Sequence, residues 1–364
     1  MNPGPEQAAA WMARALRLAE RGLLSTHPNP RVGCVIVRDG AVVGEGWHQR
    51  AGEPHAEVLA LREAGAHACG AEVFVTLEPC SHFGRTPPCA DALIAAGVRK
   101  VWMAMQDPNP KVAGQGAQRL REAGIDVETG LMEAAARALN RGFVSRMLRG
   151  RPWVTLKLAA SLDGRTAMAS GESQWITSEA ARADVHRLRA QAGAVLTSSA
   201  TVLADDPALT VRSFEAPRQP DRIVLDARGR VPAQAQVWRE GARRMLLTAS
   251  ANPVVPDGVE VVRLPATADG HVPLLPALAA LAARQVNEVL VECGPRFAGL
   301  LLQAEAVDEL VLYLAPSLLG DGARPLAMLP GLERLSQQLR FAWREARAVG
   351  PDLRLTLAPQ ASQG

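Results

Sequence analysis

Residues 55–57 read His55-Ala56-Glu57, and residues 76–89 read Thr-Leu-Glu-Pro-Cys-Ser-His-Phe-Gly-Arg-Thr-Pro-Pro-Cys, which places cysteines at positions 80 and 89. One imidazole and two thiolates leave the fourth position of a zinc ion open, as is typical of a catalytic zinc site. Zinc in such a site lowers the pKa of bound water to about 7. Glu57 can then move the water proton to a leaving amine, the role of this carboxylate in zinc deaminases with an H-x-E and P-C signature. The pattern predicts a zinc-dependent hydrolase that removes an amine.

The spacing of these residues sets conditions on the local structure. Residues two apart do not share a helix face, so we expect His55 at the start of a helix. Eight residues separate Cys80 from Cys89, in place of the two in P-C-x-x-C, so Cys89 requires a loop excursion. Taken singly, His55 could be an ordinary helix-opening residue and both cysteines could be small buried side chains. The four residues together, in this order and beside prolines, favour the metal site.

Length and charge bound the remaining possibilities. At roughly 150 residues per domain, 364 residues predict two domains. The chain has 40 basic and 37 acidic side chains, and the net charges of residues 1–146 and 147–364 are +1 (16 minus 15) and +2 (24 minus 22). Neither half is basic enough for nucleic-acid binding, so we expect no nucleic-acid partner.

The apolar and cysteine patterns indicate the cellular compartment of the protein. The longest apolar stretch, Val272–Ala283, has 12 residues and contains two prolines, whereas a spanning helix needs about 20. Charged residues from Glu6 to Arg21 interrupt any secretory signal, so we expect a cytoplasmic protein without a membrane segment. Five cysteines, an odd number without an extracellular context, favour free thiols or metal ligands over disulfides.

Both halves of the chain have an α/β pattern. In the first half, Asp39-Gly40 predicts a tight hairpin turn, and helices and strands then alternate. A basic stretch with glycine and proline, residues 147–152, predicts a linker, which gives domains of residues 1–146 and 147–364. The strands expected in the first half are Val32–Val37, Ala41–Trp47, Glu72–Leu77 and Arg99–Met105, and its helices Pro5–Arg21, His55–Ala64 and Cys89–Ala96. The strands expected in the second half are Trp153–Leu158, Ala194–Thr197, Arg222–Leu225, Arg243–Thr248, Glu288–Cys293, Glu309–Ala315 and Leu353–Leu357.

The residues of the second half do not by themselves reveal its chemistry. Its Gly320-Asp321-Gly322 lacks the third glycine of the dinucleotide fingerprint G-x-G-x-x-G, and no P-loop is present. From its residues alone, this half is an unassigned α/β domain with a Gly-Pro turn after the strand that ends at Glu292-Cys293.

The two halves together resemble the bacterial bifunctional deaminase/reductase family of riboflavin biosynthesis. The resemblance rests on the motifs quoted above, including the insertion between the cysteines, and on further segments along nearly the whole chain. These segments are His27–Pro30, Gln106–Pro110, Lys157–Arg165, Ser173–Thr177, Asp205–Arg212 and Glu292–Pro295. The resemblance implies a cytidine-deaminase-like three-layer domain followed by a dihydrofolate-reductase-like domain.

The resemblance also implies two reactions and their cofactors. The first is zinc-dependent deamination of 2,5-diamino-6-(5-phosphoribosylamino)pyrimidin-4(3H)-one, a small phosphorylated pyrimidine. The second is NADPH-dependent reduction of the ribosyl group to ribityl, the work of an oxidoreductase. In the deaminase half, it implies zinc ligands His55, Cys80 and Cys89, the proton shuttle Glu57, and substrate contacts at Asn29, His48, Arg85 and Thr86.

In the reductase half, the resemblance implies two groups of contacts. NADPH positions carry over to Ala159, Trp175, Thr201, Asp205, Gly294, Pro295, Arg296, Phe297, Ala298, Gly299 and Leu300. Substrate positions carry over to Lys157, Ser173, Arg189, Leu209, Arg212 and Glu292. Physically, Ser173, Arg189 and Arg212 suit a phosphate, while Lys157, Asp205 and Glu292 could orient sugar hydroxyls or supply a proton. Trp175 could instead be a core residue and Arg189 an exposed helix residue.

Two other function classes compete with this hypothesis. A nucleic-acid deaminase would need a basic stripe with stacking aromatics, which the weakly charged second half lacks. A module with structural zinc would need a fourth protein ligand, for which His82 is the nearby candidate. We also expect the protein to be a homo-oligomer, specifically a dimer.

Overall fold

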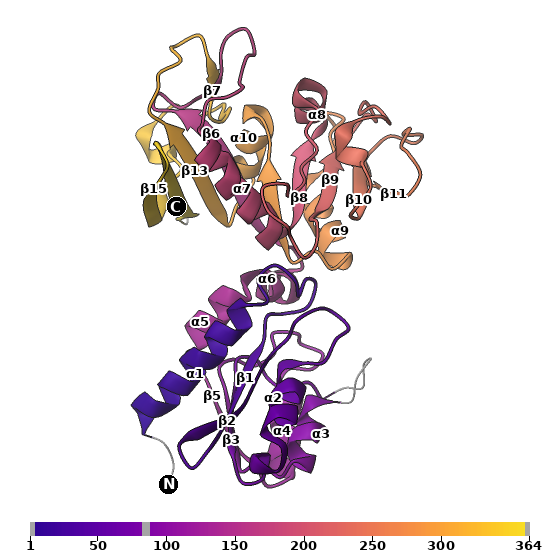
Figure 1. The fold of residues 1–364 in the computed structure, drawn as a ribbon. Coiled ribbons are helices and arrows are strands. Elements are labelled where there is room, and N and C mark those ends of the chain that lie inside the picture. The colour runs from indigo at the N-terminus through magenta and orange to yellow at the C-terminus, as the bar shows by residue number, and fades with distance from the viewer. Residues whose placement is uncertain (1–3, 82–87, 361–364) are drawn as a thin grey trace. The chain divides into compact units, whose positions relative to one another are not determined.

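The chain folds into two compact units, each with its own sheet and core (Figure 1). The computed structural model describes residues 4–81 and 88–360. The units are Met1–Gly150 and Arg151–Gly364, so the division lies four residues (150 minus 146) beyond the one expected from the sequence. The reason is that helix α6 (Arg141–Arg149) extends into the first half of the expected linker and is followed by Gly150, which has a positive φ.

The N-terminal unit has a five-stranded mixed sheet in the order β2-β1-β3-β4-β5. β1 pairs antiparallel with β2 through the Asp39-Gly40 turn and antiparallel with β3, whereas β3, β4 and β5 are parallel. The strands are β1 (Gly33–Arg38), β2 (Ala41–Trp47), β3 (Glu72–Val75), β4 (Lys100–Met103) and β5 (Asp126–Thr129). The helices are α1 (Pro5–Glu20), α2 (Ala56–Ala64), the 3-10 turn η1 (Gly65–Ala68), α3 (Cys89–Ala95), α4 (Gln115–Glu122), α5 (Glu133–Leu139) and α6.

Helices cover both faces of this sheet, which confirms the expected three-layer α/β/α domain. α1 and α5 lie on one face, and α2, α3 and α4 lie on the other (Figure 1). Two glycines of β2 allow α2 to pack directly on the strand. A Cβ at Gly44 would lie 2.2 Å from the carbonyl oxygen of Ala60, and a Cβ at Gly46 would lie 2.2 Å from that of Ala56. This close approach fixes the first turn of α2, where Glu57 lies.

The C-terminal unit has a nine-stranded sheet in the order β11-β10-β9-β8-β12-β6-β13-β16-β15. The run from β11 to β13 is parallel, and β16 and β15 extend it antiparallel. Its strands are β6 (Trp153–Ser161), β8 (Gly193–Ser198), β9 (Asp221–Leu225), β10 (Arg244–Thr248), β11 (Val259–Arg263), β12 (Glu288–Glu292), β13 (Glu309–Ala315), β15 (Phe341–Val349) and β16 (Asp352–Pro359). A separate pair consists of β7 (Arg165–Ala167) and β14 (Arg324–Pro325).

Helices pack around this sheet and direct several N-termini toward the ends of its parallel strands. They are α7 (Glu179–Ala192), α8 (Ser199–Asp205), α9 (Leu274–Ala283) and α10 (Pro295–Gln303), with 3-10 turns η2 (Gln236–Trp238) and η3 (Leu335–Gln337). A buried carboxylate on α7, Asp184, fixes this helix to the sheet. It accepts hydrogen bonds from the hydroxyl of Tyr313 at 2.7 Å and from Arg347 and Arg354 at 3.0 Å. The last two turns of α7, which carry His186 and Arg189, therefore have a fixed position.

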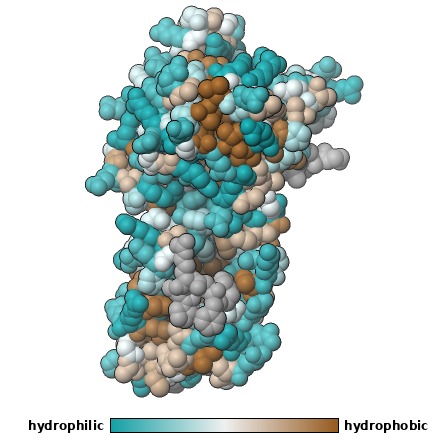
Figure 2. Space-filling view, turned by 90° about the vertical axis from the view of Figure 1, so that its right-hand side faces the viewer, coloured by the Kyte–Doolittle hydropathy of each residue, from teal (hydrophilic) through white to brown (hydrophobic). Residues whose placement is uncertain are grey.

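The protein surface is mainly polar on the face shown in Figure 2, as the charged and polar residues of the sequence predict. Small apolar groups lie between the hydrophilic ones. Within residues 4–81 and 88–360, every helix is too short or too polar to cross a bilayer.

Candidate metal centre and ligand cavity

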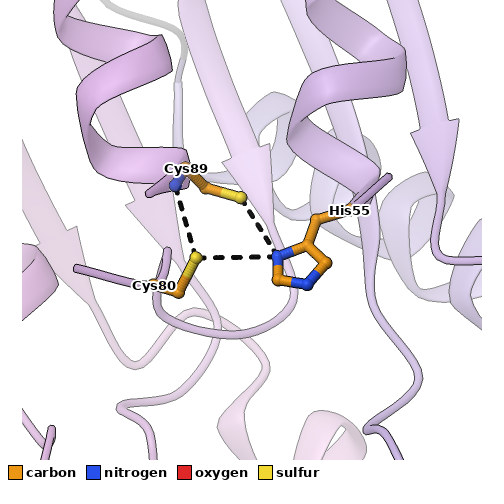
Figure 3. A group of neighbouring side chains, drawn as sticks. All are labelled: His55, Cys80 and Cys89. Atoms are coloured by element: carbon orange, nitrogen blue, oxygen red, sulfur yellow. Dashed lines mark hydrogen bonds between the residues drawn. The ribbon is translucent and has the colours of Figure 1, made fainter. Parts of the chain in front are cut away.

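His55, Cys80 and Cys89 come together in the N-terminal unit (Figure 3). His55 is the residue before the first turn of α2, Cys80 lies beyond β3, and Cys89 is the first residue of α3. Nδ1 of His55 lies 3.2 Å from Sγ of Cys89 and 3.6 Å from Sγ of Cys80. All three ligand atoms lie within 4.8 Å of one another. One imidazole and two thiols converging on one point are the donors that zinc prefers, so the residues fit the expected metal.

The two cysteines of the cluster are not equivalent. Sγ of Cys80 accepts a hydrogen bond from the backbone N–H of Cys89 at 3.3 Å. The pKa of Cys80 is lowered to about 4, first by the hydrogen bond from the Cys89 thiol and then by that from His55. Those same contacts with a thiolate, together with burial, raise the pKa of Cys89. Cys80 is therefore the more readily ionised thiol of the two, and Cys89 would have to lose its proton to bind a cation as a thiolate.

Glu57 lies in the first turn of α2, two residues after His55. Its side chain is buried, and Oε2 has no hydrogen-bond partner in the described part of the chain. Burial raises the pKa of Glu57 to about 7. A buried carboxylate oxygen without a hydrogen-bond partner lowers the stability of the fold. Such an oxygen is expected at a site where a reacting molecule completes its hydrogen bonds.

Two of the expected substrate residues lie beside the metal cluster. The ring of His48 is perpendicular to that of His55, with centroids 5.3 Å apart. Nδ1 of His48 lies 3.2 Å from the carbonyl oxygen of Pro54, which can only accept, so Nδ1 carries a proton. Burial lowers the pKa of His48, so the ring is neutral and Nε2 accepts from the amide of Asn29 at 3.0 Å. The other expected residues, Arg85 and Thr86, and the alternative ligand His82 lie outside the described residues.

Glu78 supports this centre and was not expected from the sequence. Its buried carboxylate accepts three backbone N–H groups, those of Asp107, Gly114 and Ala117, each at 3.0 Å. These bonds join the segment before Cys80 to the loop that leads into α4 and to the first turn of that helix. A glutamate two residues before a cysteine gives no sequence signal for partners 29 to 39 residues away.

The C-terminal unit contains a large cavity at the carboxyl ends of its parallel strands. Its volume is about 1520 Å³, and its walls come from β6, α7, α8, β12, α10 and the loops between them. Most of the residues expected to bind NADPH or substrate line it: Lys157, Ala159, Ser173, Trp175, Arg189, Thr201, Asp205, Leu209, Arg212, Glu292, Gly294, Pro295, Arg296, Phe297 and Leu300. Ala298 and Gly299 do not line it; a Cβ at Gly299 would lie 1.8 Å from the carbonyl oxygen of Met328.

Three charged residues form an ion-pair cluster in this cavity. Arg189 donates to both carboxylate oxygens of Glu292, from Nε at 2.5 Å and from Nη2 at 3.0 Å. Nζ of Lys157 lies 4.0 Å from Oε2 of Glu292. Burial alone would raise the pKa of Glu292, but the charges of Arg189 and Lys157 outweigh it and lower the pKa to about 2. Nη1 of Arg189 donates to the carbonyl oxygen of Thr210 at 3.0 Å, so each of the three guanidinium nitrogens already donates one hydrogen bond.

The structure decides two of the open alternatives about individual residues. Trp175 is not a core residue, because 64% of it is exposed, with the guanidinium of Arg182 4.4 Å from its ring. Arg189 is not an exposed helix residue, because only 12% of its side chain is accessible.

His186, one turn before Arg189, also lines the cavity and was not singled out from the sequence. It is buried, and its Nδ1 has no partner in the described part of the chain. Burial, and then the charges of Arg189 and Arg212, lower its pKa to about 4. The spacing of three between His186 and Arg189 was the available signal, since such residues share a helix face.

Comparison with known proteins identifies both units. A family model described as "RibD C-terminal domain" matches residues 152–355, and one described as "Cytidine and deoxycytidylate deaminase zinc-binding region" matches residues 5–105. The riboflavin biosynthesis protein RibD of Escherichia coli (strain K12) is 57% identical over 360 residues, which cover 95% of this chain and 98% of that protein. The chain belongs to the RibD family.

Further RibD proteins extend this result. RibD of Haemophilus influenzae is 46% identical and covers 97% of this chain and 98% of its own. A structure of Acinetobacter baumannii RibD superposes with a TM-score of 0.91 at 47% identity, covering 98% of this chain and 100% of that one. A Thermotoga maritima structure superposes with a TM-score of 0.88 at 33% identity, covering 98% and 99%; its title names a diaminohydroxyphosphoribosylaminopyrimidine deaminase/5-amino-6-(5-phosphoribosylamino)uracil reductase.

Membership in the RibD family confirms the expected fold and the expected pair of activities. The N-terminal unit is a cytidine-deaminase-like, zinc-dependent deaminase domain, and the C-terminal unit is a dihydrofolate-reductase-like reductase domain. The chain is a bifunctional enzyme of riboflavin biosynthesis. This assignment replaces the nucleic-acid deaminase and the structural zinc module considered above.

Proposed function

We propose that the chain catalyses two successive steps on one phosphorylated pyrimidine. The first removes the ring 2-amino group of 2,5-diamino-6-(5-phosphoribosylamino)pyrimidin-4(3H)-one, and the second reduces its ribosyl group to ribityl with NADPH. The observation that carries the proposal is the presence, in one RibD-family chain, of a His-Cys-Cys cluster beside Glu57, whose Oε2 has no partner among the described residues, and of a separate cationic cavity. The activities named for the Thermotoga maritima relative support the choice of substrate.

In the deaminase step, His55, Cys80 and Cys89 would hold zinc, which supplies a Lewis acid that makes water nucleophilic at neutral pH. Glu57 takes a proton from the attacking water and passes it to the amine, which leaves as ammonia. Its pKa near 7 suits both halves of this transfer. Asn29 and His48, joined by their hydrogen bond at the cluster, contact the pyrimidine ring, and Arg85 and Thr86 hold its phosphoribosyl group.

In the reductase step, the charge of the cavity supports two phosphorylated ligands. Nine lysine or arginine side chains line the cavity in the described part of the chain, against four aspartates and glutamates. The cations are Lys157, Arg182, Arg189, Arg212, Arg228, Arg230, Arg239, Arg296 and Arg324; the anions are Asp205, Asp206, Asp269 and Glu292. Because the guanidinium of Arg189 is engaged, Arg212 and Ser173 are the groups free to hold the substrate phosphate, while Arg189 orients Glu292.

NADPH would lie in the same cavity and supply a hydride to C1′ of the sugar. Residues Gly294–Phe297, at the start of α10, would receive its pyrophosphate, because backbone N–H groups at a helix start attract anions, and Leu300, in the second turn of α10, would contact the cofactor from the same wall. Thr201 fixes this turn, since its hydroxyl accepts the N–H of Gly294 at 3.3 Å. Ala159, Asp205 and the exposed ring of Trp175 complete the expected contacts.

Lys157 is the best candidate for the proton donor to the ring oxygen of the opening sugar. Glu292, with a pKa of about 2, is ionised and has no proton to give at neutral pH. Burial lowers the pKa of Lys157, which weakens its hold on a proton, while the charge of Glu292 keeps the ammonium form populated. Glu292 and Arg189 then act by placing Lys157 and a sugar hydroxyl.

We further propose that the protein is a cytoplasmic homodimer. A reducing compartment suits both the free thiols of the metal cluster and a reduced nicotinamide cofactor. The outer strand β15 exposes 67% of Trp343, and η3 exposes 84% of Leu335. Apolar groups beside an open strand edge favour self-association, which light scattering would measure as twice the chain mass.

One assay tests the two-step proposal. Zinc-loaded protein receives the diaminopyrimidine ribosyl phosphate, and ammonia release and NADPH absorbance are followed separately. Both signals, with NADPH loss dependent on earlier ammonia release, are expected. Ammonia release without NADPH loss would disprove the reductase half of the proposal. The absence of both signals would show that this compound is not the substrate.

A further inference from the structure

Two arginines on the turn after β9 line the reductase cavity, and neither the sequence motifs nor the proposed mechanism uses them. Arg228 and Arg230 flank Gly229, whose φ of +67° bends the chain. The buried carboxylate of Asp226 accepts the N–H of Val231 at 2.8 Å and closes the turn. The turn therefore places both arginines at the cavity wall.

Both guanidinium groups are available to an anion. Arg228 is exposed and forms no hydrogen bond or ion pair with the described residues. Arg230 donates from Nη2 to the hydroxyl of Ser199 at 3.1 Å, which holds the side chain without neutralising its charge. The acidic groups of the cavity have other contacts: Oδ1 of Asp206 accepts the N–H of Gln236, and Asp269 lies 3.7 Å from His271.

The order of the strands places these arginines relative to the reacting centre. β6, β12, β8 and β9 are consecutive parallel neighbours, so their carboxyl ends form one edge. Lys157 lies on β6, Glu292 ends β12, and the Arg228–Arg230 turn follows β9. Three strand spacings separate β6 from β9, or about 14 Å. A dinucleotide whose nicotinamide lies beside Lys157 and whose pyrophosphate lies at the start of α10 must extend its adenosine toward β9.

We propose that Arg228 and Arg230 bind the 2′-phosphate of the adenosine ribose and thereby select NADPH over NADH. This inference rests on the proposed reductase function. NADH has a hydroxyl at that position, so two arginines at this wall add charge-assisted hydrogen bonds to NADPH alone. Each such bond is worth about 10- to 100-fold in affinity.

Equilibrium binding tests this without catalysis. Dissociation constants of NADPH and NADH are measured by titration calorimetry on the full chain with Arg228→Ala, Arg230→Ala and both changes together. Each single change is expected to weaken NADPH about 10-fold or more and to leave NADH unchanged. Lysine at either position restores part of the NADPH affinity, because it keeps the charge and loses the fork geometry.

Arg296→Ala is the matched control, because it removes one charge from the same cavity at the proposed pyrophosphate position. It is expected to weaken NADPH and NADH by the same factor. If Arg228→Ala and Arg230→Ala leave the ratio of the two constants unchanged in protein with wild-type melting temperature, the inference is wrong. If the wild-type chain binds neither nucleotide, the proposed reductase function itself fails, which is a different result from an unchanged ratio.

Discussion

Arg189 on α7 and Glu292 at the end of β12 face each other as a two-point ion pair, although 103 residues separate them in the chain. Because of this ion pair, the unfolding free energy of the C-terminal unit depends on pH in the acidic range. The pKa of Glu292 is about 2 in the folded protein and 4.5 in an unfolded chain. Its stabilisation is therefore complete above about pH 5 and is lost as the pH falls toward 2.

The first prediction follows from this titration. Glu292→Gln removes the charge, so the melting temperature of the C-terminal unit should depend less steeply on pH between 5 and 3 than in the wild type. The shift of 2.5 units (4.5 minus 2) corresponds to on the order of 3 kcal/mol. Calorimetric melting across this range measures it, and parallel acid slopes for variant and wild type would contradict the assignment.

Glu57→Gln should retain zinc and lose ammonia release by about a hundredfold or more, because an amide cannot relay a proton. NADPH oxidation on the already deaminated substrate should remain, since the change lies in the other unit. Metal content by elemental analysis and the two activity signals provide the check. Undiminished ammonia release by a zinc-loaded variant would remove Glu57 from the mechanism.

Removing the metal should separate the two activities. A strong chelator removes the ion itself, and Cys89→Ala removes one of its three proposed ligands. Ammonia release should stop in both cases. NADPH binding measured by calorimetry should stay at its wild-type strength. Readdition of zinc should restore the chelated wild-type protein but not the variant, and recovery by both would show that Cys89 is not a ligand.

Lys157→Ala should abolish reduction and leave ammonia release intact. In the wild type the reduction rate should fall at high pH, because the proton donor must be charged. Since burial lowers the pKa of Lys157, the midpoint of this fall should lie below the ordinary lysine pKa of 10.5. Steady-state rates of NADPH loss from pH 6 to 10 measure the profile. A rate independent of pH across that range would exclude Lys157 as the donor.

Gly46→Ala tests how closely α2 must approach β2. The added Cβ would lie 2.2 Å from the carbonyl oxygen of Ala56, so the helix must shift, at a cost of about 1–3 kcal/mol in unfolding free energy. The shift moves His55 and Glu57, so zinc affinity should fall as well. Gly4→Ala is the control, because nothing lies within 4 Å of its Cβ. Equal stability of the two variants would contradict the packing argument.

Much of the metal centre was predictable because its chemistry depends on few residue types in a fixed order. His55, Glu57, Cys80 and Cys89 lie at the ends of elements that the sequence also marks, so the expected cluster forms in the structure. The exact limits of elements were less predictable. β11 and β15, the two edge strands of the C-terminal sheet, were not expected, and charged residues at 344, 345 and 347 interrupt the apolar pattern of β15.

The reductase cavity could not be assembled from the sequence without a resemblance. Lys157, Arg189 and Glu292 come from three elements with no local pattern in common, and only the sheet order brings them together. The same reason hides Glu78, whose partners lie on other loops. Arg189 was expected to suit a phosphate because side-chain type does not reveal that Glu292 and Thr210 already occupy it.

The position of β12 has a consequence for synthesis on the ribosome. This strand lies between β6 and β8 in the sheet, yet it is made about 90 residues after β8 ends (288 minus 198). All three residues of the metal cluster have been made once residue 89 has emerged, and the partners of Glu78 follow by residue 117, whereas Lys157 cannot meet Glu292 until most of the chain has been translated. A message cut short before β12 therefore encodes the whole N-terminal unit but lacks Glu292, and it leaves β6 and β8 with unpaired edges where β12 would join them.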